Sequence, residues 1–363
     1  METRLTMRPA AYCFLAALAA ASCGQDITAP DIPVTRPATA DAGAASWRMI
    51  LLTGPDQVQV PAPDPVTSEA YRAELAAIAA AQRTLTDEQR DIVRFWSAGA
   101  VLRWNEFLRE LVARFNLPPA PRPDGTYPLP NAAAPFDDPQ FPFSNPPYAA
   151  RAYSYVSVAQ FDALKAAWHY KYQYRRPAPS QVDASVNALV SAGDLPAYPS
   201  EDGVLTGVNE TLLRALFPAA AAEIAAKAAE QRSAALWSGR AAPSDIAAGV
   251  ALGQGVAAVA LARAGADGMR SAVGTAAQWQ LLVDGAAGRG EMPWKSLELP
   301  PRPPMLPFFG QVRGWMLTPA DFVSERPTPP PSTSSGQMQQ ELAEVRSAVD
   351  NLTREQVDVV YRW

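Results

Sequence analysis

The chain has 363 residues, of which 48% are hydrophobic, and its formal net charge is only -5. This length and composition suffice for a substantial buried core, either as one large domain or as two small ones. Because the sequence contains no long run of one charge, we expect no nucleic-acid partner and no polybasic membrane-binding patch. The 36 prolines predict long irregular connections around the folded part.

The first 22 residues are typical of a signal peptide. Arg4 and Arg8 precede an apolar stretch that ends in small residues. The sequence Ala20-Ala21-Ser22 before Cys23 resembles a bacterial lipoprotein cleavage box, in which the cysteine becomes the lipidated N-terminus. The alternative is an ordinary secretory signal that is cut after Ala21. Lipidation of Cys23 predicts a protein that is exported to the bacterial cell envelope and anchored to a membrane there, on the periplasmic or outer-membrane face.

Two further segments bear on the membrane. Residues 23–46 are rich in Pro, Ala, Thr and Asp without a periodic apolar face, which favours a flexible tether. Residues 246–262 are uncharged, but they are too few and too rich in Ala and Gly for a typical membrane span. We interpret them as a buried core helix, in which Gly249 and Gly253 allow a neighbouring helix to approach closely.

Apolar residues recur at helical spacing through most of the sequence. They predict a first helix over 69–83. Thr86, with Gln89 three residues later, predicts a capping box that starts a second helix, whose apolar residues include Ile92 and Trp96. Further helices are expected at 101–115, 148–172, 179–192, 200–216, 219–237 and 244–264. Since no stretch alternates with a period of two, the predicted fold class is an all-α helical bundle.

The predicted core spans residues 47–290. Within it, residues 118–147 are dense in Pro, Asn, Asp and Phe, which indicates a long functional or surface-wrapping loop. After the core we expect a Pro-rich extended segment at 291–335 and a terminal helical segment at 336–363.

The terminal segment 336–363 repeats residues 69–96. Leu85 to Trp96 recurs as Leu352 to Trp363, and Glu74-Leu75-Ala76 recurs as Glu341-Leu342-Ala343, at the same offset of 267 residues (352 − 85 and 341 − 74). We therefore expect two related helical hairpins that bracket one core. The first copy continues into another helix where the second stops, which suggests truncation of a longer ancestor.

Two stretches carry the residues that are most relevant to function: Pro199-Ser200-Glu201-Asp202-Gly203 and the segment 237–245. In setting and spacing they resemble the active-site segments of the type 2 phosphatidic acid phosphatase and vanadium-dependent haloperoxidase superfamily. The resemblance covers about residues 85–268 and implies that superfamily's helical bundle. It also implies a site in which cationic side chains, helix N-termini and two histidines surround an oxyanion, namely vanadate in the peroxidases and phosphate in the phosphatases.

The first two segments match the superfamily only in part. Lys171 matches its lysine, whereas Ala178 stands where its arginine is expected and Arg176 lies two residues earlier. Ser200 matches the serine of the second segment, but Asp202 replaces the histidine, and Glu201 replaces the glycine between them.

The third segment departs further. Ala235 and Ala241 stand where the superfamily has an arginine and a histidine, and only Asp245 matches. The single histidine of the chain, His169, lies on the same predicted helix as Lys171 but roughly on the opposite side, so we expect it to be exposed.

The acidic residues of the second segment also oppose an oxyanion site. A carboxylate about 4 Å from an oxyanion costs on the order of 4 kcal/mol at an effective dielectric constant near 20. Ser200 is expected to cap a helix whose positive end Glu201 and Asp202 complement. These features predict a degenerate, non-catalytic site with no cofactor, in a protein that binds or scaffolds an unidentified protein or small molecule.

Two alternatives remain open from the sequence. One is a phosphatase that uses Asp202 with Lys171 and Arg176; haloperoxidase activity is less favoured, because the missing histidine would hold vanadate. The other is a site for a hard cation such as Ca²⁺, formed by Glu201, Asp202 and Asp245.

Overall fold

The computed structural model describes residues 47–115, 122–126, 146–190, 195–297, 299 and 301–362. The chain divides into two units, Met1–Trp47 and Arg48–Trp363. The predicted signal peptide, Cys23 and the tether therefore lie outside the described residues, as does most of the predicted loop at 118–147.

Three helices open the described chain: α2 (Glu69–Arg83), α3 (Asp87–Ser97) and α4 (Ala100–Phe115). The bounds of α2 are those that the sequence predicts. Its N-terminus is capped by Ser68, whose hydroxyl accepts a hydrogen bond from the backbone N–H of Tyr71 at 3.1 Å. Thr86 and Gln89 form the predicted capping box of α3.

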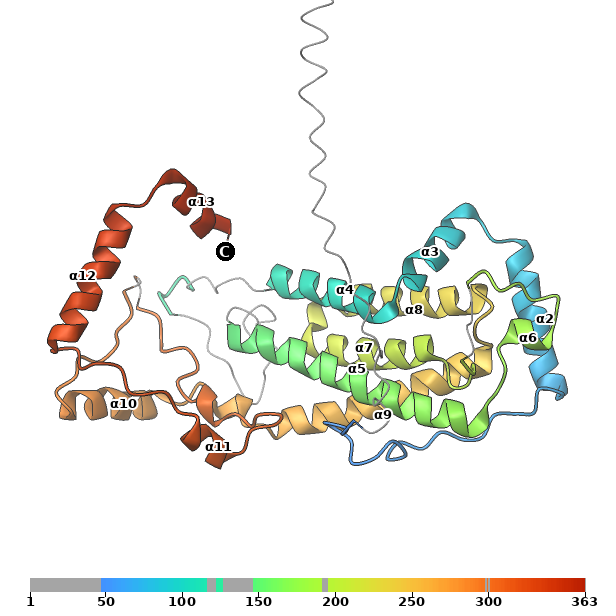
Figure 1. Cartoon of the computed structure of the whole chain (residues 1–363), viewed down its shortest axis with the longest axis horizontal. Coiled ribbons are helices and arrows are strands. Elements are labelled where there is room, and N and C mark those ends of the chain that lie inside the picture. Colours follow the sequence, from blue (N-terminus) through green and yellow to red (C-terminus); the bar gives the residue numbers. More distant parts are fainter. Residues whose placement is uncertain are drawn as a thin grey trace, which may run out of the picture. The chain divides into compact units, whose positions relative to one another are not determined.

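Four longer helices form the bundle: α5 (Pro146–Tyr174), α7 (Glu201–Leu216), α8 (Ala221–Trp237) and α9 (Pro243–Gly265). α7 contacts α5, α8 and α9, so it is the central helix of the bundle (Figure 1). Val204, Val208 and Leu212 of α7 are buried in the main apolar core. The described residues contain no strand, and the all-α prediction is confirmed for them.

Glycines allow α7 and α9 to pack closely. A Cβ atom on Gly249 or Gly253 of α9 would collide with the backbone carbonyl of Ser200 or Val204. Gly203 and Gly207 of α7 meet the α9 backbone in the same way. The expectation that Gly249 and Gly253 serve close packing inside a bundle is therefore confirmed.

By length and composition alone, α9 and the turn after it could also cross a membrane. The stretch Pro243–Ser271 contains a window with a mean hydropathy of 1.6, and 44% of that window is buried inside the protein. A buried core helix passes the same test, and the close packing against α7 identifies α9 as such a helix.

The predicted helix over 179–192 is wrong for residues 183–190. Among the described residues of that range, only the single turn α6 (Pro179–Val182) is helical, and an irregular turn follows it; residues 191 and 192 lie outside the described part. The reason is that polar side chains divert the backbone: Asp183 accepts a hydrogen bond from the N–H of Ser185, and Gln82 of α2 accepts one from the N–H of Asn187.

An extended segment at residues 48–65, here called the strap, precedes α2 and is held by side chains of the bundle. The buried carboxylate of Asp162 on α5 accepts hydrogen bonds from the backbone N–H groups of residues 50, 51 and 52. The hydroxyls of Tyr170, Tyr174 and Tyr198 donate to the carbonyls of residues 58, 60 and 61. The strap is thus fixed through its backbone.

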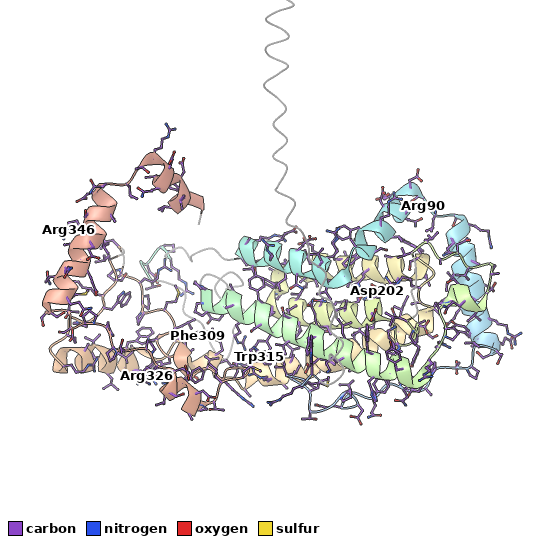
Figure 2. All side chains as sticks on the ribbon, viewed as in Figure 1. Arg90, Asp202, Phe309, Trp315, Arg326 and Arg346 are labelled. Atoms are coloured by element: carbon purple, nitrogen blue, oxygen red, sulfur yellow. The ribbon has the colours of Figure 1, made fainter. Side chains whose placement is uncertain are left out.

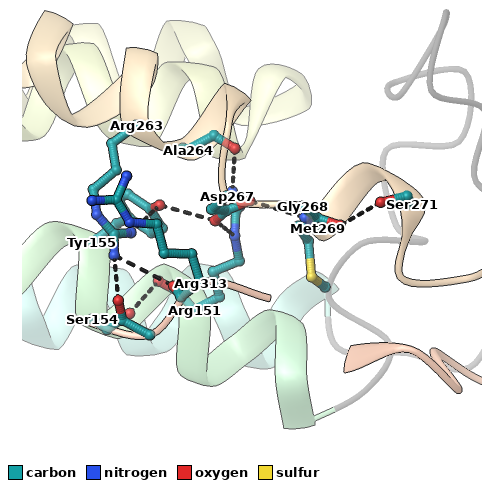
Figure 3. A network of polar contacts seen from close by, with 11 residues as sticks. Arg151, Ser154, Tyr155, Arg263, Ala264, Asp267, Gly268, Met269, Ser271 and Arg313 are labelled. Atoms are coloured by element: carbon teal, nitrogen blue, oxygen red, sulfur yellow. Dashed lines mark hydrogen bonds and ion pairs between the residues drawn. The ribbon is translucent and has the colours of Figure 1, made fainter. Parts of the chain in front are cut away.

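A buried polar network follows α9 (Figure 3). Asp267 accepts hydrogen bonds from Arg151 at 2.8 Å and from the Tyr155 hydroxyl at 2.9 Å. Arg263 donates to the same hydroxyl at 2.6 Å, and its guanidinium carbon lies 3.7 Å from the ring centroid of Trp315. Burial, followed by the hydrogen bond to Asp267, raises the pKa of Tyr155. This network ties the chain after α9 to α5.

The remaining helices are α10 (Ala276–Gly288), α11 (Pro319–Ser324), α12 (Gly336–Asp350) and α13 (Arg354–Arg362). The sequence analysis did not predict α10 or α11. Among the residues that the structure describes, no side chain of α10, α11 or α12 is buried.

Candidate functional site

Three helix ends meet at the candidate site. Lys171 lies in the last turn of α5, Ser200 caps the N-terminus of α7, and Asp245 lies in the first turn of α9. The Ser200 N–H donates to the carbonyl of Asp245 at 2.9 Å, which joins the two helix N-termini. The fold therefore brings together the segments that the sequence singles out.

Arg176 is buried and takes part in an internal ion pair. Its Nη1 lies 2.8 Å from Oδ1 of Asp245, and the two side chains are 2% and 0% exposed. Nη1 also donates to the Ser244 hydroxyl at 3.0 Å, and Nη2 donates to the carbonyl of Asp64 at 2.7 Å. The guanidinium carbon lies 4.0 Å from the ring centroid of Tyr71. Only Nε lacks a hydrogen-bond partner within the described part of the chain.

Asp245 is held by the same pair and by the backbone. Its Oδ2 accepts a hydrogen bond from the N–H of Ala242 at 2.7 Å. Burial raises the pKa of this carboxyl, while Ala242 and Arg176 favour its charged form. Ala242 occupies the cap position of α9, and the Asp245 side chain satisfies its backbone N–H.

Lys171 is also buried, and its ammonium group donates to the carbonyl of Pro196. Burial lowers the pKa of Lys171, and the nearby carboxylates of Glu201 and Asp245 partly oppose this shift. A lysine with these partners supplies little positive charge to a ligand.

The second segment begins α7 as the sequence predicts. The Ser200 hydroxyl accepts a hydrogen bond from the N–H of Gly203 at 3.3 Å. The Asp202 carboxylate accepts one from Gln231 at 3.1 Å and lies 4.0 Å from Arg240. Burial raises the pKa of Asp202, and the charge of Arg240 opposes that rise. Glu201 accepts a hydrogen bond from the indole N–H of Trp168.

The positions at which the superfamily has basic side chains are apolar and closed. Ala178, Ala235 and Ala241 are each at most 3% exposed. Ala235 and Ala241 form a small apolar cluster with Ile246.

Sequence reasoning missed several residues of the site. Glu74 of α2 accepts hydrogen bonds from the hydroxyl and the N–H of Ser244, at 2.8 and 3.3 Å. Gln231 and Arg240 contact Asp202, and Tyr71 covers Arg176. Glu74 was visible only as part of the internal repeat, which gave no hint of its contact with α9.

His169 is exposed, as expected, and lies outside the site. Among the described residues, no three His, Cys, Asp or Glu side chains are grouped so that they could hold a metal ion. One carboxylate oxygen of Asp245 accepts from Arg176 and the other accepts from the N–H of Ala242. These bonds compete with coordination of a cation by the same oxygens.

The described core is thus a helical bundle in which the N-termini of α7 and α9 meet the C-terminal end of α5. The sequence matches no known protein-family profile and no curated protein. Among solved structures, the chain is similar to a bacterial vanadium-dependent iodoperoxidase, with 19% identical residues and a TM-score of 0.45. The similarity covers 63% of this chain and 59% of that one, so the chain spans less than two thirds of the iodoperoxidase. Similarity at this level carries nothing about activity over to this chain.

Proposed function

We propose that this chain is a non-catalytic relative of the phosphatidic acid phosphatases and haloperoxidases, exported and lipid-anchored through Cys23, whose helical core binds or scaffolds a partner. The observation that carries the proposal is the buried ion pair of Arg176 with Asp245 at 2.8 Å. An arginine that is paired internally in this way is not available to hold an oxyanion.

The surrounding charges support the same conclusion. Asp202 lies in the first turn of α7, at the position where the resemblance implies the histidine of the superfamily. Its carboxylate would repel an oxyanion at that helix end. Lys171 is bound to the carbonyl of Pro196, and the carboxylates of Glu201 and Asp245 lie near it, with Arg240 as a further nearby cation. A phosphate or vanadate group at this place would therefore have to compete with these carboxylates for the positive charges.

Calorimetric titration tests this proposal directly. The soluble chain 24–363 is titrated first with orthovanadate and then with phosphate, and we expect no binding up to millimolar concentration. The control is the double variant Asp202→His/Ala241→His, which restores both histidines; vanadate binding gained by it would identify a vestigial pocket. Micromolar binding by the unaltered chain would overturn the proposal.

A second candidate function rests on Asp202 and its neighbour Arg240. The half-buried carboxyl of Asp202, with a raised pKa and Arg240 at 4.0 Å, has features of a proton carrier in a phosphatase. In that case Asp202→Asn would abolish hydrolysis of an aryl phosphate without unfolding the chain. Absence of hydrolysis in the unaltered chain would exclude this function for that substrate class.

The raised pKa of Asp202 also predicts a pH dependence of stability. The folded state binds the proton of this carboxyl more tightly than the unfolded state does. Its contribution to stability therefore falls as the pH rises from the ordinary carboxyl pKa through the raised folded value. Asp202→Asn should remove this slope and make the chain more stable than the unaltered protein at neutral pH, measured by urea unfolding at several pH values.

Export and anchoring are tested separately. In a bacterial host, the full chain should fractionate with membranes and incorporate labelled palmitate, and Cys23→Ser should do neither. A soluble, unlabelled full chain would contradict the anchoring without affecting the proposal for the core.

A further inference from the structure

The C-terminal helices repeat α2 and α3 in structure as well as in sequence. We call α2–α3 the first hairpin and α12–α13 the second hairpin. Both bounds of α12 and the start of α13 lie 267 residues after those of α2 and α3. Ser335 caps α12 by accepting from Met338 N–H at 3.1 Å, as Ser68 does for α2. Thr353 and Gln356 exchange the hydrogen bonds of a capping box at α13.

The first helix of each hairpin also carries an equivalent, largely apolar face. In α2 the buried side chains include Tyr71, Leu75, Ile78 and Gln82, which are spaced i, i+4, i+7 and i+11 along one side of the helix. The corresponding residues of α12 are Met338, Leu342, Val345 and Val349. Leu342, Val345 and Val349 are 45%, 62% and 60% exposed, so this face is uncovered in the described chain. Figure 2 labels Arg346, which follows Val345 on α12.

The first hairpin shows what such a face covers. Leu75 and Ile78 pack in one buried cluster with Val186 and Ala242, next to the start of α9. Glu74 accepts hydrogen bonds from Ser244 at the N-terminus of α9. The first hairpin therefore covers small apolar side chains beside a helix N-terminus and places a carboxylate at that positive helix end.

The second hairpin keeps the features that this contact uses. Glu341 occupies the position of Glu74, and Leu342 occupies that of Leu75. The face therefore matches a surface with the same two properties, namely small apolar side chains and backbone N–H groups at the start of a helix.

The second hairpin matches the α8–α9 surface of this chain less well than the first hairpin does. Gln82 donates to the carbonyls of Asn187 and Trp237 and accepts from the N–H of Asn187, at 2.7, 2.9 and 2.8 Å. Val349 stands at the corresponding position and could form none of these bonds. In an identical copy the surface is also already covered by that copy's first hairpin.

We propose that the second hairpin docks onto a second, non-identical helical core of the same architecture. It covers the helix that corresponds to α9, with Glu341 at the N-terminus of that helix and Leu342, Val345 and Val349 on the adjoining apolar surface. Where this chain has polar backbone groups facing Gln82, the partner core has an apolar contact for Val349. The proposal does not depend on whether the site around Asp202 binds an oxyanion.

A graft tests whether the second hairpin can cover such a core. In the full chain, residues 69–95 are replaced by the sequence of residues 336–362, which has the same length. Two grafts are compared by urea unfolding: one complete, and one that keeps Gln82. We expect both to fold, with a lower urea midpoint for the complete graft. In a third graft, the leucine that the second hairpin supplies at position 75 is replaced by aspartate, and this graft should lose cooperative unfolding. If the graft that keeps Gln82 does not fold, or if all three behave alike, the proposal is wrong.

Two further measurements on the soluble chain 24–363 address the other occupants of this face. We expect the chain to sediment as a monomer and not to float with vesicles of phosphatidylethanolamine and phosphatidylglycerol. A dimer that Leu342→Asp abolishes would replace the proposal with self-pairing of the second hairpin. Flotation that Leu342→Asp abolishes would replace it with membrane binding.

Discussion

The first and second hairpins have closely related sequences, the same caps and the same helix starts, yet among the described residues only the first has side chains buried against the core. The two hairpins therefore show that the residues which define a helix and the residues which stabilise it in the fold can be separated. Capping residues and helical periodicity determine where a helix begins and ends, whereas burial of its apolar face decides how much the helix contributes to the stability of the fold. Matched substitutions at corresponding positions of the two hairpins test this separation.

The largest difference is expected at the shared leucine. Leu75 is 2% exposed, whereas Leu342 is 45% exposed. Leu75→Ala should lower the free energy of unfolding by about 2–5 kcal/mol, because it removes buried methyl groups and leaves a cavity. Leu342→Ala should change it by no more than about 0.5 kcal/mol. Urea unfolding of both variants measures the contrast, and equal losses would show that the second hairpin is also buried.

The next difference concerns Gln82 and Val349. Gln82→Val introduces the residue of the second hairpin and leaves the polar backbone groups of Asn187 and Trp237 without their partner. The loss should be about 1–3 kcal/mol in the free energy of unfolding. The reverse change, Val349→Gln, should have no measurable effect on the same transition. A destabilising Val349→Gln would mean that Val349 is covered within this chain.

A smaller effect is expected at the caps. Thr86→Ala removes the hydroxyl that accepts from Gln89 N–H and should cost about 1 kcal/mol. Thr353→Ala breaks the same bond in α13 and should leave global unfolding unchanged. Its effect should be local, as faster amide hydrogen exchange in residues 354–362. Global destabilisation by Thr353→Ala would contradict the contrast between the hairpins.

The smallest effect is electrostatic. Glu74→Gln removes a negative charge from the N-terminus of α9 and should cost about 0.3–1 kcal/mol at low salt. High salt should reduce this loss, because ions screen charges at a partly exposed helix end. Glu341→Gln should be neutral at either ionic strength. A salt-independent loss at Glu74 would indicate that its hydrogen bonds to Ser244, rather than its charge, stabilise the structure.

Much of the fold could be predicted because local signals encode it. The bounds of α2 follow from the helical spacing of its apolar residues, and the capping box at Thr86 and the cap at Ser200 follow from side chains within three residues of a helix start. The same kind of signal was overlooked at Thr275 and Gln278, which cap α10. The helix over 179–192 failed for another reason: Gln82, more than a hundred residues earlier, binds the backbone of Asn187 and holds it in a turn.

The candidate site was less predictable, because its important contacts join distant segments. The sequence identified Lys171, Arg176, Ser200 and Asp202, and the fold does bring their segments together. It gave no sign that Arg176 would pair with Asp245, 69 residues away. The contact of Glu74 with Ser244 spans 170 residues, and no periodicity or local motif reports such a pairing.

The strap also has a mechanical consequence. Asp162 holds three successive N–H groups at residues 50–52, ahead of the points where Tyr170, Tyr174 and Tyr198 hold the strap. Tension applied to the chain before Trp47 therefore reaches the middle of α5 before it reaches α2. The hydrogen bonds of the strap would therefore have to break before a force applied at the N-terminus could act on the first hairpin.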